Sequence, residues 1–137
     1  MKNFIEKIKK NYRDSFKQSN KPPKSIAEFM KDLGKDEQDF FKYYNSFFEL
    51  DKDIWSDVAI TTINKVKGEE VYQNYSVREK MLSFLFTLSE VMKDDQSFVR
   101  YQFKNKKNER FGLTPRFLDD FKKEFMSFSH EIVNEGL

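Results

Sequence analysis

The sequence predicts an all-α protein of about seven helices. Apolar residues recur at spacings of three and four along the chain, which is the period of an amphipathic helix, and no alternating run is long enough to indicate a sheet. The 4 Gly and 3 Pro residues fall between these periodic segments. Charged residues make up 35% of the chain, so the 16 Phe, 6 Tyr and 1 Trp must supply much of the core.

The first three helices are predicted over residues 3–19, 25–33 and 36–44. Pro22 and Pro23 follow the first helix and stop it, because proline lacks an amide hydrogen and restricts the residue before it. Gly34 is the expected left-handed C-cap of the second helix, and Asp36 is the expected N-cap of the third. The apolar stripes of the first two helices consist of Phe4, Ile5, Ile8, Tyr12, Phe16, Ile26, Phe29, Met30 and Leu33.

Capping-box patterns predict the starts of the fourth and fifth helices. Ser46 and Glu49 begin a helix that runs to about residue 67, before Gly68, and Ser76 and Glu79 begin the next. The expected buried residues of the fourth are Leu50, Ile54, Val58 and Ile63, with Trp55 beside them. Those of the fifth are Met81, Leu82, Leu85, Leu88 and Met92.

The last two helices follow breaks in the periodic pattern. Asp94-Asp95 separates the fifth helix from a sixth, which carries Phe98, Val99, Tyr101 and Phe103. Thr114 as N-cap and Pro115 at the first helical position predict the start of a seventh helix that runs to residue 134. Its apolar face consists of Phe117, Phe121, Phe125, Phe128 and Ile132.

A short helix, a glycine turn and a second short helix make a helix-turn-helix pattern in the first fifty residues. In such a module the third helix lies in the DNA major groove, whereas the simpler alternative is three amphipathic helices that close a small core. Residues 1–50 carry 11 Lys/Arg and 8 Asp/Glu, a formal charge of +3 that weakly favours an anionic partner. We therefore assign residues 1–45 to a helix-turn-helix domain and residues 46–137 to a helical C-terminal domain.

The stretch SIAEFMKDLGKDEQDFFKYYNSFFELDKDIW, residues 25–55, resembles the DNA-binding module of the TetR/AcrR family of transcriptional regulators. The match runs through Leu33-Gly34, the Asp36 cap, Phe40 to Tyr44, and then Ser46 and Leu50. The later stretches YSVREKMLSFLFTLSEVMKDDQSFVRYQF and TPRFLDDFKKEFMSFSHEIVNEG resemble most closely a short TetR-like group of Bacteroidetes-type bacteria. The resemblance implies a DNA-binding regulator whose C-terminal helical domain binds an apolar small molecule.

The chain departs from the family pattern where DNA phosphates are usually contacted. Phe41 replaces a tyrosine and Phe47 replaces a lysine, while Glu37 and Asp39 add negative charge beside Asp36. Acidic residues near a phosphate backbone oppose binding. The residues left to contact DNA are Lys24, Ser25, Lys35, Gln38, Lys42 and Tyr43, of which Gln38 can pair with adenine and the lysines with phosphate or guanine. The same side chains also suit a solvated surface.

Apolar residues of the second half are candidates for a ligand cavity, since Met and Phe are adaptable pocket linings. The expected ligand-binding residues are Met81, Phe84, Leu88, Phe98, Tyr101, Phe121 and Phe125. Aromatic stripes at helical spacing are packing far more often than pocket. We therefore expect most of these residues to be core, with a minority facing a cavity.

Several classes of function lack the residues that they need. The absence of cysteine excludes disulfides and thiolate sites, and His130 is the sole histidine, so a histidine dyad or multi-histidine metal centre is excluded. No catalytic constellation, glycine-rich phosphate loop, signal peptide or apolar span is present. We expect a cytoplasmic protein that is not an enzyme and uses no cofactor or metal.

Three interpretations follow from the sequence. The first is a TetR-like regulator that binds DNA and an apolar effector. The second is a TetR-like fold that has lost DNA binding and binds a lipid or other apolar ligand, with Phe41 and Phe47 forming an apolar patch. The third is a protein-interaction module that uses this patch. TetR-like proteins usually continue with two dimerising helices, so we expect a truncated C-terminal domain, and a homodimer if the full-length chain continues past Leu137.

Overall fold

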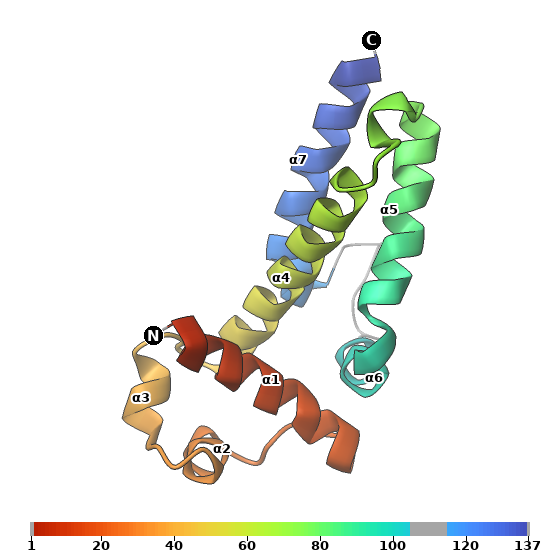
Figure 1. The fold of residues 1–137 in the computed structure, drawn as a ribbon. Helices are drawn as coiled ribbons and strands as arrows, with labels where there is room; N and C mark the ends of the chain where they lie inside the picture. Colours follow the sequence, from red (N-terminus) through yellow and green to blue (C-terminus); the bar gives the residue numbers. More distant parts are fainter. Residues whose placement is uncertain (1, 105–114, 137) are drawn as a thin grey trace. The chain divides into compact units, whose positions relative to one another are not determined.

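The computed structural model describes residues 2–104 and 115–136, and these residues confirm the all-α prediction. Seven α-helices follow one another in the described ranges, and no residue in them forms a β-strand (Figure 1). Their bounds are α1 Lys2–Ser19, α2 Ile26–Asp32, α3 Glu37–Phe41, α4 Phe47–Lys67, α5 Val77–Val91, α6 Gln96–Lys104 and α7 Asp119–Gly136. Single 3₁₀ turns lie at Tyr72–Asn74, Lys93–Asp95 and Arg116–Leu118.

Local side-chain hydrogen bonds set most of the helix starts at the predicted residues. The Ser25 hydroxyl accepts a hydrogen bond from the Glu28 amide at 3.1 Å, and the Ser46 hydroxyl accepts one from the Glu49 amide at 3.2 Å. The Ser76 hydroxyl accepts from the Glu79 amide at 3.1 Å, while the Glu79 carboxylate accepts from the Ser76 amide at 2.9 Å. These bonds satisfy amide groups that have no partner within the helix.

Two predicted helix ends were wrong. The third helix was expected to reach residue 44 but ends at Phe41, because the amides of Tyr43 and Tyr44 both turn back to the Phe40 carbonyl at 3.0 Å. The seventh α-helix begins at Asp119 rather than beside Pro115, because a 3₁₀ turn over Arg116–Leu118 comes first and buries Phe117. The expected N-cap Thr114 lies outside the described residues.

The chain forms two compact units that do not coincide with the predicted domains. Unit 1 consists of residues 1–51 and 95–117, and unit 2 consists of residues 52–94 and 118–137. The helix α6, expected in the C-terminal domain, therefore belongs to the same unit as α1, α2 and α3. The long helix α4 contributes its first residues to unit 1 and the others to unit 2.

The core of unit 1 is built mainly from aromatic rings. Tyr12 and Phe16 of α1 are at most 2% exposed, and Phe98 of α6 lies 5.3 Å from Phe16 between ring centroids. The Tyr12 hydroxyl donates a hydrogen bond to Asp51 Oδ1 at 2.7 Å, and Gln102 Nε2 of α6 donates to the same oxygen at 3.0 Å. The contacts of α6 with α1 and Asp51 explain why it joins unit 1.

The core of unit 2 lies between the second part of α4, α5 and α7. Its buried cluster consists of Val66, Tyr72, Phe84, Phe128 and Ile132, and Phe84 stacks on Phe128 with ring centroids 5.4 Å apart. Met81, Leu88, Phe121 and Phe125 are partly buried against this cluster. The stripe of α5 that faces the core is therefore centred on Phe84.

Three residues assigned to apolar stripes lie on the surface instead. Leu82 and Leu85 of α5 are 52% and 51% exposed, because the opposite side of the helix, with Phe84, faces the core. On α6, Phe103 is 47% exposed, and Gln102 occupies the buried position next to it, where it reaches Asp51. Among the described residues, no helix has the length and apolar character that crossing a membrane requires.

Candidate nucleic-acid interface

The helices α2 and α3 pack against each other across a tight turn at Gly34. Gly34 has φ +72°, in the left-handed region that side chains with a Cβ rarely adopt. The Gly34 amide donates to the Lys31 carbonyl and the Lys35 amide to the Met30 carbonyl, both at 2.9 Å, so two carbonyls at the end of α2 are satisfied. Glycine thus performs the predicted role of ending α2 and redirecting the chain into α3.

Two of the three acids at the start of α3 are engaged by their own helix. Asp36 Oδ1 accepts the Asp39 amide at 3.2 Å, and Asp39 Oδ2 accepts the Asp36 amide at 3.3 Å, which completes a capping box. Hydrogen bonding to the Asp36 amide, and then to Lys42, lowers the pKa of Asp39. Asp36 and Asp39, which are expected to oppose phosphate binding, therefore have a structural role: they stabilise the start of a five-residue helix.

Four of the six predicted DNA-contacting residues have exposed side chains on or beside α2 and α3: Lys24, Lys35, Gln38 and Lys42. Lys42 lies beyond the last residue of α3 and its ammonium is 3.3 Å from Asp39 Oδ1. The Lys35 ammonium lies 5.8 Å from the centroid of the Phe4 ring. We call Lys24, Lys35, Gln38 and Lys42 together the α2–α3 surface.

The other two predicted residues have roles within the fold. The hydroxyl of Ser25 is the N-cap of α2, although the residue is exposed. Tyr43 is partly buried, with its ring 6.1 Å from that of Phe4 of α1. Tyr43 therefore fixes the end of α3 on α1, a contact between distant residues that the sequence could not reveal.

The apolar patch expected from Phe41 and Phe47 does not form. Phe41 is 42% exposed, but Phe47 is partly buried and stacks on Tyr12 at 5.1 Å between ring centroids. Phe47 also packs edge-on against Phe29 and Phe40, at 5.9 and 5.7 Å. Phe47 is thus part of the unit 1 core.

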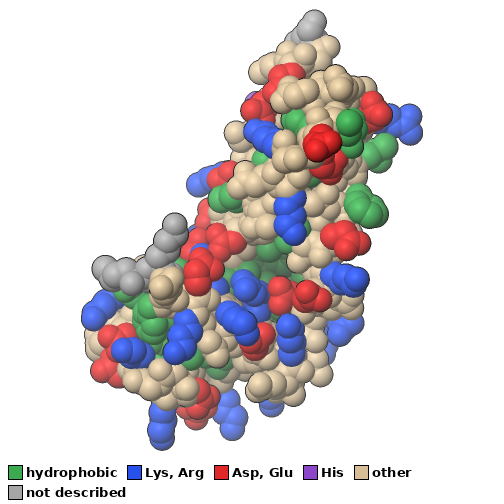
Figure 2. Space-filling model, in the orientation of Figure 1, with side chains coloured by type: hydrophobic (Ala, Val, Ile, Leu, Met, Phe, Trp, Pro, Cys, Tyr) green, Lys and Arg blue, Asp and Glu red, His purple; other side chains and the backbone are tan. Residues whose placement is uncertain are grey.

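Charge is unevenly divided between the two units. The described residues of unit 1 contain 14 Lys/Arg and 10 Asp/Glu, a formal net charge of +4, whereas those of unit 2 contain 8 Lys/Arg and 12 Asp/Glu, a net charge of −4. Figure 2 shows Lys and Arg side chains spread over the visible face of unit 1, with fewer Asp and Glu among them. Most of this positive charge is already present in residues 1–50, which carry +3.

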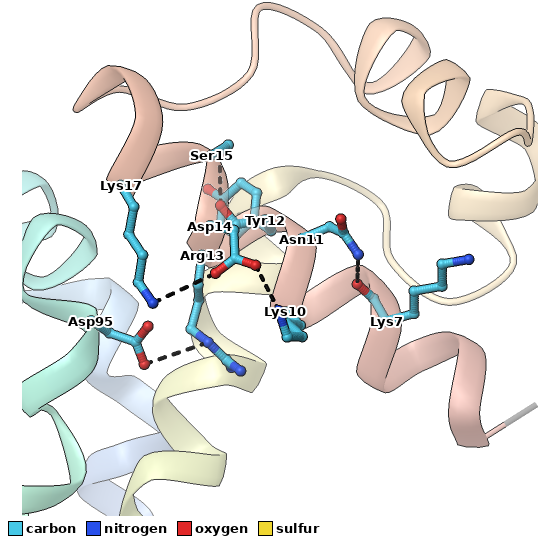
Figure 3. A network of polar contacts seen from close by, with 9 residues as sticks. All are labelled: Lys7, Lys10, Asn11, Tyr12, Arg13, Asp14, Ser15, Lys17 and Asp95. Atoms are coloured by element: carbon cyan, nitrogen blue, oxygen red, sulfur yellow. Dashed lines mark hydrogen bonds and ion pairs between the residues drawn. The ribbon is translucent and has the colours of Figure 1, made fainter.

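Part of the positive charge on α1 is neutralised by neighbours. Asp14 lies 2.8 Å from the Lys10 ammonium and 3.7 Å from that of Lys17, and Arg13 pairs with Asp95 at 3.6 Å (Figure 3). The hydrogen bond from Lys10 is the main reason that the pKa of Asp14 is lowered. Lys24 and Lys35, which are exposed, are therefore better candidates for phosphate contacts than Lys42, which is paired with Asp39, or the paired cations of α1.

A polar groove of about 350 Å³ lies between α1 and α2. Three of its lining residues are the acids Asp14, Glu28 and Asp32, and Lys24 is the one cation of the lining. Because the groove is acidic, it does not suit an anionic ligand. Sequence reasoning missed it, since its two walls come from separate helices.

The predicted ligand-binding residues are divided between the two units. Phe98 and Tyr101 belong to unit 1, where both rings pack on Phe16, at 5.3 and 5.2 Å between centroids. The other five belong to unit 2: Met81, Phe84, Leu88, Phe121 and Phe125. Phe84 is 1% exposed and the other four are partly buried around it. Of the seven, Phe84 and Phe98 are buried in the core and the other five are partly buried, so their role in ligand binding stays a prediction.

No family model, curated protein or solved structure matches the chain. The resemblance to TetR-like regulators therefore stays a prediction from the sequence, and the function has to be argued from the two units themselves.

Proposed function

We propose that unit 1 binds double-stranded DNA through the α2–α3 surface, as in a TetR-type transcriptional regulator. The observation that carries this proposal is the concentration of positive charge in the unit that contains the helix-turn-helix pattern, whose described residues carry +4 against −4 in unit 2. Nucleic-acid binding is driven largely by the release of counterions from phosphates, so such a charge on one unit favours a polyanionic partner.

Phosphate contacts would dominate this binding. Lys24, Lys35 and Lys42 are exposed around α2 and α3, and lysine neutralises phosphate as a point charge. Gln38 is the exposed side chain within α3 that can form a bidentate pair with adenine. Because α3 has only five residues, few side chains reach the base edges, and we expect a modest sequence preference. Such a role implies a cytoplasmic, non-catalytic protein.

DNA titrations over a range of salt concentrations test the proposal. We expect the double variant Lys24→Glu, Lys35→Glu to bind a labelled duplex at least tenfold more weakly. Its slope of log affinity against log salt should fall by about 1.8, which is about 0.9 for each phosphate that the protein no longer neutralises. Fluorescence anisotropy measures both quantities. Gln38→Ala should leave the slope unchanged and reduce the difference in affinity between duplexes of different sequence.

The matched control is Lys122→Glu, Lys123→Glu on α7, where both lysines are exposed in unit 2. It changes the net charge by the same amount as the test variant. If it weakens binding equally, the effect comes from overall charge and not from the α2–α3 surface. If the unaltered protein binds no duplex at low salt, DNA binding through this surface is refuted.

A second candidate function is the binding of an apolar molecule by unit 2. The observation that favours it is the partial exposure of Met81, Leu88, Phe121 and Phe125 around the buried Phe84, which leaves adaptable apolar side chains accessible at the edge of the core. Native mass spectrometry of the purified protein tests it. A co-purified lipid that is lost in a Leu88→Asp variant would support this function, and an apolar effector would then complete the TetR-type mechanism.

A further inference from the structure

A cavity of about 580 Å³ lies in unit 2, where the end of α7 runs beside the start of α5 (Figure 1). Its lining includes Ser76 and Val77 at the start of α5, Lys80 one turn further on, and Glu135 and Gly136 at the end of α7. The two helices approach closely at Gly136, because a Cβ at this position would overlap the side chain of Val77. The volume falls within the range of about 300–1,000 Å³ that small-molecule sites occupy.

The ammonium group of Lys80 is buried in the wall of this cavity and is only partly satisfied. Lys80 is 5% exposed, and its Nζ lies 2.7 Å from Glu135 Oε2 and 4.7 Å from the centroid of the Tyr72 ring. An ammonium group has three N–H donors, and the Glu135 carboxylate is the one hydrogen-bond acceptor that the described residues provide for them. Because a buried donor without an acceptor is costly, Lys80 favours a ligand that carries a negative charge.

The Glu135 carboxylate is the more accessible member of this ion pair. Its side chain is 44% exposed, against 7% for that of Lys80. A carboxylate can accept about four hydrogen bonds, and among the described residues only Lys80 donates one to Glu135. The cavity therefore presents a cation with unused donors directly beside an anion with unused acceptors.

The hydroxyl of Tyr72, whose ring lies under the Lys80 ammonium, is a further buried polar group at this end of unit 2. Tyr72 is 3% exposed, and no described residue forms a hydrogen bond with its hydroxyl. Burial, and then the negative charges of Glu135 and Glu131, raise the pKa of Tyr72. Buried polar groups in proteins nearly always have a partner, so the unpaired hydroxyl supports the binding of a polar molecule in this region.

The first turn of α5 adds hydrogen-bond donors to the cavity wall. The amides of Val77 and Arg78 have no carbonyl partner within the helix, whereas Ser76 and Glu79 bind each other in the capping box. The positive end of this 15-residue helix also favours a negative group. Together with the buried Lys80, these amides form a place for an anion, and Glu135 next to it suits a cation.

We propose that this cavity binds the zwitterionic head of a free α-amino acid. The carboxylate of the ligand accepts hydrogen bonds from Lys80 and from the first amides of α5, and its ammonium donates to Glu135. A simple anion would be repelled by Glu135 and a simple cation by Lys80, whereas a zwitterion complements both charges. The rest of the cavity, which Gln73, Tyr75 and Val77 line, is open to the side chain of the amino acid.

Isothermal titration calorimetry with L-leucine and L-glutamine tests the proposal, because Val77 and Gln73 of the lining suit an apolar and a polar side chain. We expect at least one of the two to bind with a dissociation constant of about 1 mM or lower. Its N-acetyl form lacks the ammonium charge and its methyl ester lacks the carboxylate charge, so each should bind at least about tenfold more weakly. The proposal is overturned if neither amino acid binds at about 10 mM, or if the blocked forms bind equally well.

Two substitutions remove one charge each from the cavity and keep the length of the side chain. Lys80→Met and Glu135→Gln should each weaken binding of the amino acid at least about tenfold. The matched controls are Lys67→Met and Glu131→Gln, which break a second ion pair of unit 2, at 2.6 Å, whose two residues do not line the cavity. These controls should bind like the unaltered chain, and equal losses in both pairs of variants would contradict binding in this cavity.

The blocked ligands are titrated into the unaltered chain, so they test the proposal even if a variant fails to fold. Circular dichroism melts show which variants are folded. Binding of an amino acid in unit 2 does not depend on DNA binding by unit 1, and its failure would leave the proposed function standing.

Discussion

Replacing Tyr12 with phenylalanine removes one hydroxyl from the polar contact that joins α1, α4 and α6. The Tyr12 hydroxyl lies 2.7 Å from Asp51 Oδ1, and the residue is only 2% exposed. A hydrogen bond to a charged group contributes about 1.5–3 kcal/mol. The ring itself stays and keeps its stacking on Phe47, so no cavity forms. We therefore expect the free energy of unfolding to fall by about 2 kcal/mol.

Denaturant unfolding at neutral pH measures this change. The matched control is Tyr101→Phe, because the described residues provide no hydrogen-bond partner for the Tyr101 hydroxyl; its effect should stay within about 0.5 kcal/mol. Gln102→Leu removes the other donor to Asp51 Oδ1. Since both donors share one oxygen, the effect of combining the two substitutions should differ from their sum. A loss below about 0.5 kcal/mol for Tyr12→Phe would refute the role given to this contact.

The same substitution should change the response to alkaline pH. Burial, and then the charge of Asp51, raise the pKa of Tyr12 far above its ordinary value of 10.0. Above pH 10 the unfolded chain therefore releases the Tyr12 proton while the folded chain keeps it, and stability is lost as the pH rises. The slope from this one group is about 1.4 kcal/mol per pH unit. Tyr12→Phe should show a shallower loss of stability between pH 10 and higher values than the unaltered chain.

Two further substitutions test the turn and the second core. Gly34→Ala should lower the free energy of unfolding by about 1–2 kcal/mol in thermal or denaturant melts. The cause is the backbone φ of +72°, since no atom lies within 4 Å of the added Cβ and a steric clash is absent. Gly34→Asn should lower the free energy of unfolding by less, and an equal loss for the two variants would contradict a conformational cause. Phe84→Ala should cost about 3–5 kcal/mol, since the ring is 1% exposed and stacks on Phe128. Phe86→Ala, two residues away and 70% exposed, should change the free energy of unfolding little. Similar losses for the two variants would contradict the burial of Phe84 and the exposure of Phe86.

Short stretches of sequence are enough to predict where most helices begin. Ser25, Asp36, Ser46 and Ser76 accept hydrogen bonds from amides three residues ahead, and such contacts depend only on the local chain. Prediction was less reliable at the end of α3 and the start of α7. There the chain turns so that Phe40 and Phe117 can be buried, and that burial depends on residues far away along the chain.

Packing between distant segments selects which helices share a core and which faces they bury. Helix α6 joins α1 through the contact of Phe16 with Phe98 and through Gln102, which bonds to a residue 51 positions earlier in the chain. Spacing along one helix cannot predict such a pairing, which adds Arg100 and Lys104 of α6 to the unit that contains α2 and α3. Helix α5 is apolar on two sides, so its sequence fits burial of either Phe84 or Phe86. The packing of unit 2 buries Phe84 and leaves Phe86 exposed.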